Sequence, residues 1–535
     1  MLLNKEVLLE KEKLAELGVS TPDYDLGKVK ADTLSEPIWL HLGAGNIFRA
    51  FLGSAQEKML NEGRASKGII AAEGFDYEIV DVMNHYDNLT MNVTLKESGE
   101  VDYEVLGSIV EYLRMDPSAE DFKKITEIFE APSLQMVSFT ITEKGYSITN
   151  SDGDFTPQIA EDFKKGPEHV TSYIGKVVYL LHKRFEAGKH PLALVSMDNM
   201  SHNGEKLAHA VITFAKEWEK EGHVGADFVA YLEDDAKVAF PWSMIDKITP
   251  RPDEKVEAMI KELGFEDIEP RTTGMNSYVA PFVNGEETEY LIVEDSFPNG
   301  RPELDVEGII FTDRDTVNAT EIMKVTACLN PLHTALAIYG CLLGHETIHE
   351  EMKDEDLVKL IKQLGYNEGL PVVIDPKILS PKKFIDQVIE VRLPNPFMPD
   401  TPQRIATDTS QKLAIRFGNT LENHLAAGND IADIKAIPLV YAGWFRYLVG
   451  LDDNGEKFEL SPDPLFGELL PQFEGVTLGS EADKDVIYGL LSNEKIFGLD
   501  IVEAGLGEEV LALYNQMLEG PGAIRSTLQA ELAKL

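Results

Sequence analysis

A short apolar run followed at once by a glycine turn is the feature that most limits how this chain can fold. Residues 38–42 (IWLHL) form the run, and GAGNIFRAF follows from Gly43. A strand that turns on glycine into a helix is the phosphate-binding unit of dinucleotide-binding folds. Gly43 permits the tight turn, and Gly45 lets backbone N–H groups approach a pyrophosphate at the helix N-terminus. The third glycine of the G-x-G-x-x-G pattern is absent because Phe48 stands there, so an ordinary strand–turn–helix unit remains an alternative.

An acidic residue ends the next apolar run. Residues 68–73 (GIIAAE) predict a buried strand that ends at Glu73. A carboxylate at this position accepts hydrogen bonds from the adenosine ribose hydroxyls and repels a 2′-phosphate. The sequence therefore predicts NAD rather than NADP as the cofactor, with Asp76 as the alternative acid.

Strands and helices alternate along the N-terminal half of the chain. Runs typical of strands lie at 89–96, 103–110, 135–142 and 191–197, and helical patterns lie at 169–187 and 205–220. This alternation predicts an α/β Rossmann-type domain with a mostly parallel sheet, in which ligands bind at the C-terminal ends of the strands. The residues at or just after such ends are Gly43, Glu73, Glu143 and Asn199.

The second half has a different pattern. After Pro302 the sequence is mainly helical, which predicts a mainly α-helical C-terminal domain. We place the domains at residues 1–305 and 306–535. Just before this boundary, residues 278–295 predict a β-hairpin around Asn284-Gly285.

One apolar stretch of the C-terminal domain carries three polar side chains. Residues 321–344 (EIMKVTACLNPLHTALAIYGCLLG) contain Lys324, Asn330 and His333. Polar groups in such a segment need partners or a function. Asn330 suits a helix N-cap and Pro331 suits the first helical position, so the sequence predicts a break between two helices here. The alternative is a core helix with a capping asparagine and a hydrogen-bonded histidine.

The net charge of −43, from 49 basic and 92 acidic residues, excludes some partners. Such a surface repels nucleic acid and anionic membranes. Against this background, residues 392–416 carry four cations and two aspartates. Arginine can hold a carboxylate or a diol by paired hydrogen bonds, so this basic segment predicts an anion or sugar site. A solvated loop with local salt bridges is the alternative.

Several other kinds of protein find no support. The N-terminus lacks the pattern of a secretory signal, and no uninterrupted apolar run approaches the length of a membrane span. Both cysteines, Cys328 and Cys341, lie in apolar helical sequence, as in a reducing compartment. We therefore expect a cytoplasmic protein without nucleic-acid or membrane partners. No His/Cys set has zinc spacing, and no P-loop or G-x-S-x-G motif occurs, so we expect no metal.

The remaining polar residues suit one kind of chemistry. Lys324, Asn199, Asn330 and His333, combined with a nucleotide turn, suit hydride transfer between a carbinol and a nicotinamide. A lysine with a lowered pKa takes the hydroxyl proton, and amides stabilise the developing oxyanion.

Seven segments, in order, resemble the zinc-independent, polyol-specific long-chain dehydrogenases, the mannitol dehydrogenase family. They are HLGAGNIFRAF, TEKGY, DNMSHNG, MIDKITP, VEDSFPNGRP, MKVTACLNPLH and DTPQRIATDTSQKLAIR. The family includes mannitol 2-dehydrogenase, fructuronate reductase (mannonate oxidoreductase) and tagaturonate reductase. The resemblance implies a Rossmann-type domain, a helical domain, and a monomer.

The resemblance also implies catalytic roles. Lys324 is expected to be the general base, with Asn199 and Asn330 holding the substrate oxygen. His333 is expected to hydrogen-bond substrate hydroxyls. Glu321, one helical turn before the lysine, is similar to the family's glutamate that passes protons to solvent.

Binding roles follow from the same resemblance. Asp246 is expected to contact the sugar chain, while Arg404 and Lys412 bind its far end. The expected cofactor-binding residues are Gly43, Gly45, Asn46, Ile47, Phe48, Arg49, Glu73 and Glu143.

Three positions depart from the family pattern. Phe51 stands where the family usually has histidine, and Pro331-Leu332 replaces small residues. The spacing from Lys324 to Asn330 is one residue longer than usual. This extra residue predicts either a local bulge that restores the geometry or a shifted lysine with its own substrate.

We therefore expect an NAD-dependent oxidoreductase acting on a sugar acid or polyol. Fructuronate and mannonate are the first choice, because the basic segment would neutralise a uronate carboxylate. Fructose and mannitol come second, and tagaturonate and altronate third. A protein that binds nucleotide and sugar without turnover is the alternative from a different class.

Overall fold

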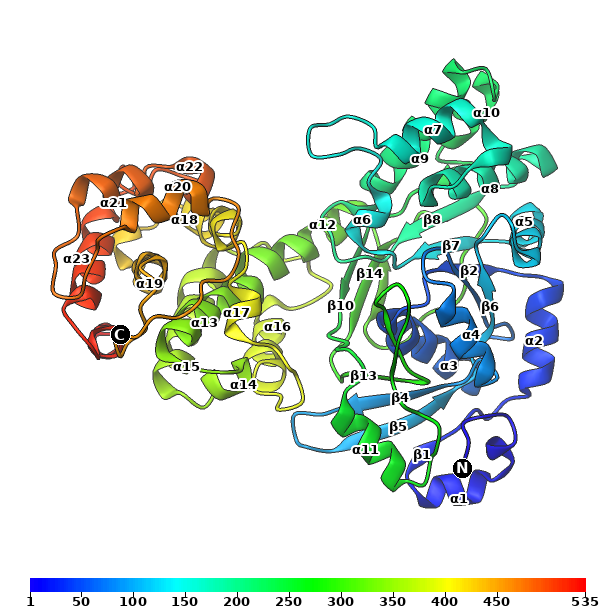
Figure 1. Cartoon of the computed structure of the whole chain (residues 1–535), viewed down its shortest axis with the longest axis horizontal. Helices are drawn as coiled ribbons and strands as arrows, with labels where there is room; N and C mark the ends of the chain where they lie inside the picture. Colours follow the sequence, from blue (N-terminus) through cyan, green and yellow to red (C-terminus); the bar gives the residue numbers. More distant parts are fainter. The chain divides into compact units, whose positions relative to one another are not determined.

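The computed structural model describes residues 1–535, which form two compact units, Met1–Asn318 and Ala319–Leu535 (Figure 1). The predicted fold class is confirmed, because the first unit is α/β and the second is mainly helical. The units divide later in the chain than the predicted boundary at 305/306. The reason is that β15 (Ile309–Thr312) still pairs, in parallel, with β14 (Tyr290–Glu294) of the first unit.

A six-stranded sheet organises the first unit, and every neighbouring pair in it is parallel. Its strands are β2 (Trp39–Leu42), β3 (Ile69–Glu73), β6 (Ile109–Arg114), β7 (Met136–Phe139), β8 (Leu192–Ser196) and β9 (Val238–Ala239). Their order in space is β6-β3-β2-β7-β8-β9. The direction of winding therefore reverses between β2 and β7, which is the place where nucleotides bind in doubly wound sheets.

Helices complete the crossovers of this sheet (Figure 1). The α-helices of the unit are α1 (Lys11–Glu16), α2 (Leu26–Ser35), α3 (Ser54–Asn61), α4 (Glu78–His85), α5 (Glu120–Glu130), α6 (Thr142–Tyr146), α7 (Pro157–Lys165), α8 (Tyr173–Gly188), α9 (Asn203–Lys220), α10 (Ala226–Glu233) and α11 (Glu254–Glu262). Helix α8 packs against α5 and α9. Their apolar residues join those of the sheet in one buried core that includes Ile70, Val137, Val177, Leu194 and Phe214. Each such side chain contributes about 1.5–3 kcal/mol through burial.

Three smaller sheets complete the first unit. Their orders are β1-β5-β4-β13, β10-β14-β15 and β11-β12. The strands not yet given are β1 (Val19–Ser20), β4 (Thr90–Leu95), β5 (Val101–Leu106), β10 (Ser243–Asp246), β11 (Arg271–Thr272), β12 (Tyr278–Val279) and β13 (Phe282–Glu286). The predicted strand at 103–110 is in fact the end of β5 and the start of β6, which belong to different sheets.

The predicted hairpin around Asn284-Gly285 is wrong. Both residues lie inside β13, which pairs with β4 in parallel, while β14 pairs with β10 and β15. The glycine serves a close approach instead of a turn, because a Cβ on Gly285 would lie 3.2 Å from the carbonyl oxygen of Ile248.

The second unit is built around two buried helices, α13 (Asn330–Leu343) and α19 (Ala436–Leu448), which pack against each other. Its other α-helices are α14 (Ile348–Glu351), α15 (Glu355–Lys362), α16 (Pro381–Gln387), α17 (Pro402–Ile405), α18 (Asn419–Ala426), α20 (Phe466–Phe473), α21 (Lys484–Leu491), α22 (Glu494–Phe497), α23 (Gly507–Leu518) and α24 (Ala523–Leu532). Aromatic rings fill the space beside α19, where Tyr441, Trp444 and Phe445 contact Phe497.

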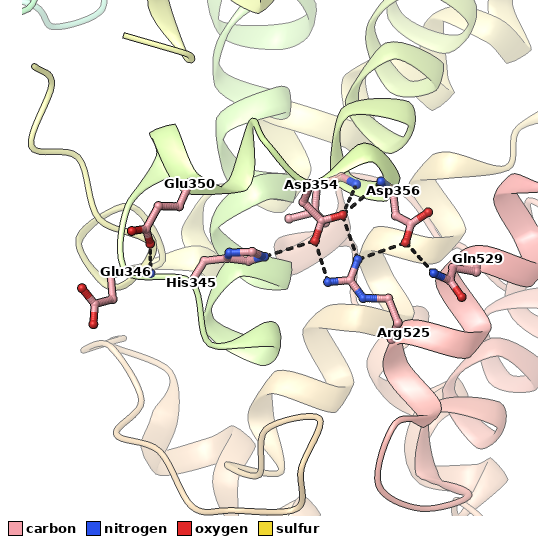
Figure 2. Close-up of polar contacts among 8 residues, drawn as sticks. His345, Glu346, Glu350, Asp354, Asp356, Arg525 and Gln529 are labelled. Carbon is pink, nitrogen blue, oxygen red and sulfur yellow. Dashed lines mark hydrogen bonds and ion pairs between the residues drawn. The ribbon is translucent and has the colours of Figure 1, made fainter. Parts of the chain in front are cut away.

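The last helix is tied to the unit by a network of charges (Figure 2). Arg525 of α24 donates to Asp354 at 2.8 and 2.5 Å and to Asp356 at 3.1 Å. His345 lies 3.2 Å from Asp354, and Gln529 donates to Asp356 at 2.8 Å. Because Asp354 also caps α15 by accepting from two backbone N–H groups, the network joins the ends of two helices that are distant in sequence.

A long helical segment connects the units. Residues Arg314–Leu343 comprise α12 (Arg314–Met323), a π-helix at Lys324–Cys328 and α13. By length and composition the segment could cross a membrane, with a mean hydropathy of 1.3, but 78% of that window is buried inside the protein. A core helix has the same composition, so this segment is weak evidence for a membrane span.

Candidate functional site

A cavity of about 1030 Å³ lies at the C-terminal edge of the six-stranded sheet. Its walls come from the loops that follow β2, β3 and β7, and from the start of α8. The lining includes residues 43–45, 73–76, 140–142 and 171–174, and Lys176. Because all strands of this sheet run in parallel, these loops meet at one edge.

Two glycines shape the floor of the cavity. Gly43 has a φ of +109°, and a Cβ on it would lie 2.4 Å from the carbonyl oxygen of Thr140. No other residue fits there, because the end of β2 touches the backbone that follows β7. A Cβ on Gly45 would meet nothing within 4 Å. Its missing side chain therefore leaves backbone open to a ligand.

The helix that begins at Asn46 starts beside this floor. Phe48 is buried and stacks on His41 with ring centroids 3.8 Å apart. The guanidinium of Arg49 is buried too, donating to the carbonyl oxygen of Ala280 at 2.8 Å and to Asn46 Oδ1 at 3.1 Å. The predicted cofactor residues Asn46, Ile47, Phe48 and Arg49 are not among those that line the cavity. The buried side chains of Phe48 and Arg49 instead hold the first turn of the helix through their contacts with His41, Ala280 and Asn46.

Glu73 lies in the cavity wall at the end of β3. Its carboxylate accepts hydrogen bonds from the backbone N–H of Ala44 at 3.0 Å and of Phe75 at 2.8 Å. Burial raises the pKa of Glu73, and these hydrogen bonds oppose the rise. Asp76, the alternative acid, also lines the cavity, and its Oδ1 is buried without a hydrogen-bond partner. Both candidate ribose acids therefore lie where the sequence predicted.

Glu143 lies outside the cavity lining. Its side chain is exposed and forms an ion pair with Lys206 at 3.0 Å. Its neighbours Thr142 and Lys144 do line the cavity. A cofactor role for Glu143 therefore stays a prediction.

Asp198, which the sequence did not predict as a site residue, holds the loop after β7. Asp198 accepts from the backbone N–H groups of Ile141 and Thr142, each at 2.9 Å, and from the Tyr146 hydroxyl at 2.5 Å. Thr142 has a φ of +64°, which is strained for a β-branched residue. The hydrogen bonds of Asp198 thus stabilise a strained turn that lines the cavity. Asp198 directly precedes Asn199 in the sequence. Its place just after a predicted strand was the only sequence signal.

Lys176 was also missed, because a lysine in an amphipathic helix gives no signal by itself. Its ammonium lies in the cavity wall and donates to the carbonyl oxygen of Met115 at 3.0 Å and to the Tyr77 hydroxyl at 3.2 Å. Burial lowers the pKa of Lys176, and the charge of Asp116 opposes this.

The predicted substrate residues of the first unit occupy separate elements. Asn199 lies in the exposed loop after β8, and Asp246 is the last residue of β10 and is buried. Both have interactions with other residues.

In the second unit, a π-helix lies at Lys324–Cys328. A local bulge there was one of the two outcomes that the longer lysine–asparagine spacing predicted, and a shifted lysine was the other. At the end of the π-helix, the backbone N–H of Leu329 donates to the carbonyl oxygen of Lys324 at 3.1 Å. Lys324 is buried at 3% exposure, and Glu321 lies partly exposed in the preceding α12. The helix break was predicted one residue too late, because Asn330 is already the first residue of α13 and Leu329 precedes it as the cap.

His333 faces a mixed set of charges. Its Nε2 lies 3.6 Å from Asp400 Oδ2 and has no hydrogen-bond partner. Burial lowers the pKa of His333, the charge of Asp400 opposes this, and Arg404 and Arg416 add to it. The imidazole is therefore neutral at pH 7 and can accept or donate one hydrogen bond.

Several charges of the predicted basic segment act on this histidine. Arg404 of α17 forms an ion pair with Asp400. The ammonium of Lys412 donates to the carbonyl oxygens of Ile405 at 3.0 Å and Thr407. Arg416, which the sequence analysis did not single out, donates to the Thr334 hydroxyl beside His333.

Both units match models of one family. "Mannitol dehydrogenase Rossmann domain" matches residues 37–306, and "Mannitol dehydrogenase C-terminal domain" matches residues 316–518. The D-mannonate oxidoreductase of Thermotoga maritima is 48% identical to this chain over 534 residues, which cover 99% of this chain and 98% of that protein.

Two solved structures are similar as well. A D-sorbitol dehydrogenase in substrate-free form superposes with a TM-score of 0.82 at 24% identity, covering 98% of this chain and 100% of its own. The mannitol 2-dehydrogenase of Pseudomonas fluorescens, in a ternary complex with NAD and D-mannitol, gives a TM-score of 0.71 at 26% identity and full coverage of both chains. Matches over both units and nearly the whole length lead to one assignment: the chain belongs to the mannitol dehydrogenase family of oxidoreductases.

Proposed function

We propose that the protein is an NAD-dependent, metal-independent oxidoreductase that interconverts fructuronate and mannonate by hydride transfer. The observation that carries the proposal is the cavity at the reversal of strand order, with Gly43 and Gly45 on its floor and Glu73 in its wall. The 48% identity to a D-mannonate oxidoreductase supports the choice of substrate pair.

The residues that line the cavity support NAD as the cofactor. Gly45 leaves room for a pyrophosphate at the start of the helix, where backbone N–H groups and the helix dipole favour a negative charge. Glu73 and Asp76 offer acceptors to a ribose diol and would repel a 2′-phosphate. The similarity to a mannitol 2-dehydrogenase bound to NAD supports the same cofactor. Bound there, NAD supplies the hydride acceptor for oxidation of the alcohol.

The protein's own residues handle the proton. In the direction of oxidation, Lys324 Nζ takes the proton of the reacting hydroxyl, and Asn330 with Asn199 holds the oxygen as the carbonyl forms. Glu321, three residues before the lysine, passes the proton on to solvent. In the reverse direction the same lysine returns the proton to the alkoxide.

Other side chains orient the sugar. His333, neutral because of burial, hydrogen-bonds a substrate hydroxyl, and Asp246 binds another. Arg404 and Lys412 hold the far end of the chain. The nucleotide turn is kept in shape by Gly43, Asn46, Ile47, Phe48 and Arg49. The family resemblance alone supports Glu143 as a cofactor contact.

The test is NADH oxidation, followed by absorbance, with fructuronate, tagaturonate and fructose in parallel and NADPH as the control. We expect turnover of fructuronate with NADH and little turnover with NADPH. Preferred reduction of fructose would replace the proposal with a mannitol 2-dehydrogenase, and preferred reduction of tagaturonate with a tagaturonate reductase. Binding of NADH without turnover of any ketose would indicate the non-catalytic alternative.

Lys324→Ala tests the base. We expect a loss of about 10²–10⁴-fold in kcat, the usual contribution of a general base, while NADH affinity measured by fluorescence is retained. Glu321→Gln serves as the comparison, because it leaves the base in place and slows only proton exchange with solvent. If Lys324→Ala keeps its turnover at every pH, Lys324 is not the base.

A further inference from the structure

Arg416 is a largely buried cation without a counter-ion in its unit. The hydrogen bond of its side chain joins the guanidinium to the Thr334 hydroxyl. Burial lowers the pKa of Arg416 to about 10, and no carboxylate opposes the effect. In a chain with 92 acidic residues, an arginine in this situation is unusual, because burying an unpaired charge is costly.

Lys412, one helical turn earlier, is also a cation without an ion pair. Its backbone carbonyl oxygen accepts from the backbone N–H of Arg416 at 3.0 Å. Its ammonium donates only to the carbonyl oxygens of Ile405 and Thr407. The carboxylates of Asp408 and Asp463 act on it from a distance, and Asp463 is already bonded to the backbone N–H and hydroxyl of Ser410. The charge of Arg416 also acts on Lys412, so the two cations are neighbours, and such a pair suits an anion.

Arg404, in the same segment, differs from this pair. Its guanidinium forms an ion pair with Asp400, and 63% of its side chain is exposed. A carboxylate that approached Arg404 would have to compete with Asp400. Of the three cations, Arg404 is therefore neutralised by a carboxylate, whereas Lys412 and Arg416 have no ion pair.

The position of Arg416 links it to the proposed reaction. Thr334, which binds its guanidinium, directly follows His333 on α13, and the Thr334 hydroxyl donates to the carbonyl oxygen of Asn330 at 2.9 Å. Arg416 is therefore fixed to the first turn of the helix that carries two of the proposed catalytic residues. In fructuronate the carboxylate and the reacting carbonyl lie on the same short chain, so a cation this near can bind one while the other reacts.

We propose that Arg416, together with Lys412, binds the carboxylate of the sugar-acid substrate, and that Arg416 makes the enzyme select an acid over a neutral polyol. The inference rests on the proposed function and extends it by naming the specificity residue. Arginine suits this role because its planar guanidinium binds a carboxylate through two parallel hydrogen bonds.

The test compares Arg416→Gln with the wild type on fructuronate and on fructose, with saturating NADH. We expect kcat/KM for fructuronate to fall roughly 100-fold, mainly through KM, because a charge-assisted bidentate contact is lost. The value for fructose should change less than about 3-fold, since fructose has no carboxylate for the arginine to bind. Arg416→Lys should recover part of the loss. Lys383→Gln, which removes an exposed cation of the same unit, is the matched control for charge.

Two further measurements separate recognition from folding. Because Arg416 has no counter-ion, Arg416→Gln should keep or raise the melting temperature, whereas a structural role predicts a fall. Calorimetry of mannonate binding in the presence of NADH should show the same loss of affinity without requiring turnover. Equal losses for fructuronate and fructose, or no loss for fructuronate, would overturn the inference. If the wild type itself fails to reduce any uronate, the proposed function is wrong; if it reduces fructuronate and Arg416→Gln does so equally well, only the inference is wrong.

Discussion

Lys412 keeps its charge in surroundings that disfavour it. Burial lowers the pKa of Lys412 to about 8, and the nearby charge of Arg416 adds to this, while Asp408 and Asp463 oppose it. The ammonium is therefore cationic below about pH 8 and becomes neutral above it. A bound carboxylate favours the cationic form, so affinity for an acid depends on a proton that is lost in a range accessible to kinetics.

We expect KM for fructuronate to rise as the pH increases through about 8, while KM for fructose rises much less. Lys412→Arg should remove this rise, because arginine keeps its charge throughout the range. The measurement is a set of steady-state profiles between pH 6 and pH 10, with both ketoses and both proteins. An identical rise in the arginine variant would assign the ionisation to another group.

Some site residues could be predicted from the sequence, and others could not because the fold sets their partners. Gly43 and Glu73 could be predicted, because a strand–turn–helix pattern fixes where its glycine and acid lie. Arg404 and Arg416 lie in one basic segment, and only the fold shows that Asp400 neutralises the first. Asp198 was missed for the same reason, since its partners Ile141 and Thr142 are distant in sequence.

At the scale of elements, an ion-pair network ties α24 to the start of α15. Arg525 binds Asp354 and Asp356 near the start of α15 (Figure 2). Burial raises the pKa of Asp354, but the hydrogen bonds and charge of Arg525 outweigh it, and the net shift is downward from 3.8. A carboxylate with a lowered pKa stabilises the fold above its unfolded pKa and loses that contribution as the pH falls through its folded pKa.

Arg525→Ala should destabilise the second unit by about 2 kcal/mol at pH 7, because two partly buried carboxylates lose the donor that they share. This corresponds to a fall of roughly 5 °C in its melting temperature. The difference from the wild type should shrink as the pH falls below about 4, because the folded pKa of Asp354 is lowered and the stability that it contributes is lost as the pH falls through that pKa. Differential scanning calorimetry at pH 7 and at pH 3.5 checks both points, with Arg525→Lys as the partial control. A difference that stays constant with pH would mean that packing, not charge, ties α24 to α15.

Elements were predictable where one physical signal dominated. The strands β2, β3, β7 and β8 are short apolar runs bounded by turn residues, and α8 and α9 show helical periodicity, so all six were found. The hairpin prediction at Asn284-Gly285 failed because the same dipeptide occurs both in tight turns and in crowded parallel strands. Which strand lies beside which is tertiary information, and local pattern does not contain it.

For the molecule as a whole, the net charge of −43 opposes the substrate that the site is proposed to bind. At low ionic strength the acidic surface repels an anion at long range, and added salt screens that repulsion. The contacts made by a partly buried cation pair are screened much less.

We expect kcat/KM for fructuronate to rise several-fold as ionic strength increases from about 0.01 to 0.15 M. The value for fructose, which is neutral, should stay nearly constant over the same range. Stopped-flow or steady-state kinetics at saturating NADH provide the measurement. A fall for fructuronate would show that the basic segment, and not the total charge, governs the encounter.

The π-helix at Lys324–Cys328 also bears on how such a chain diverges. A π-turn takes up one residue more than an α-turn, so a helix can gain a codon there while the segments on either side, α12 and α13, remain helical. The bulge absorbs the insertion within a single turn. A helix with such a bulge can therefore change the spacing between its side chains by one residue, in one mutational event, without first losing the fold.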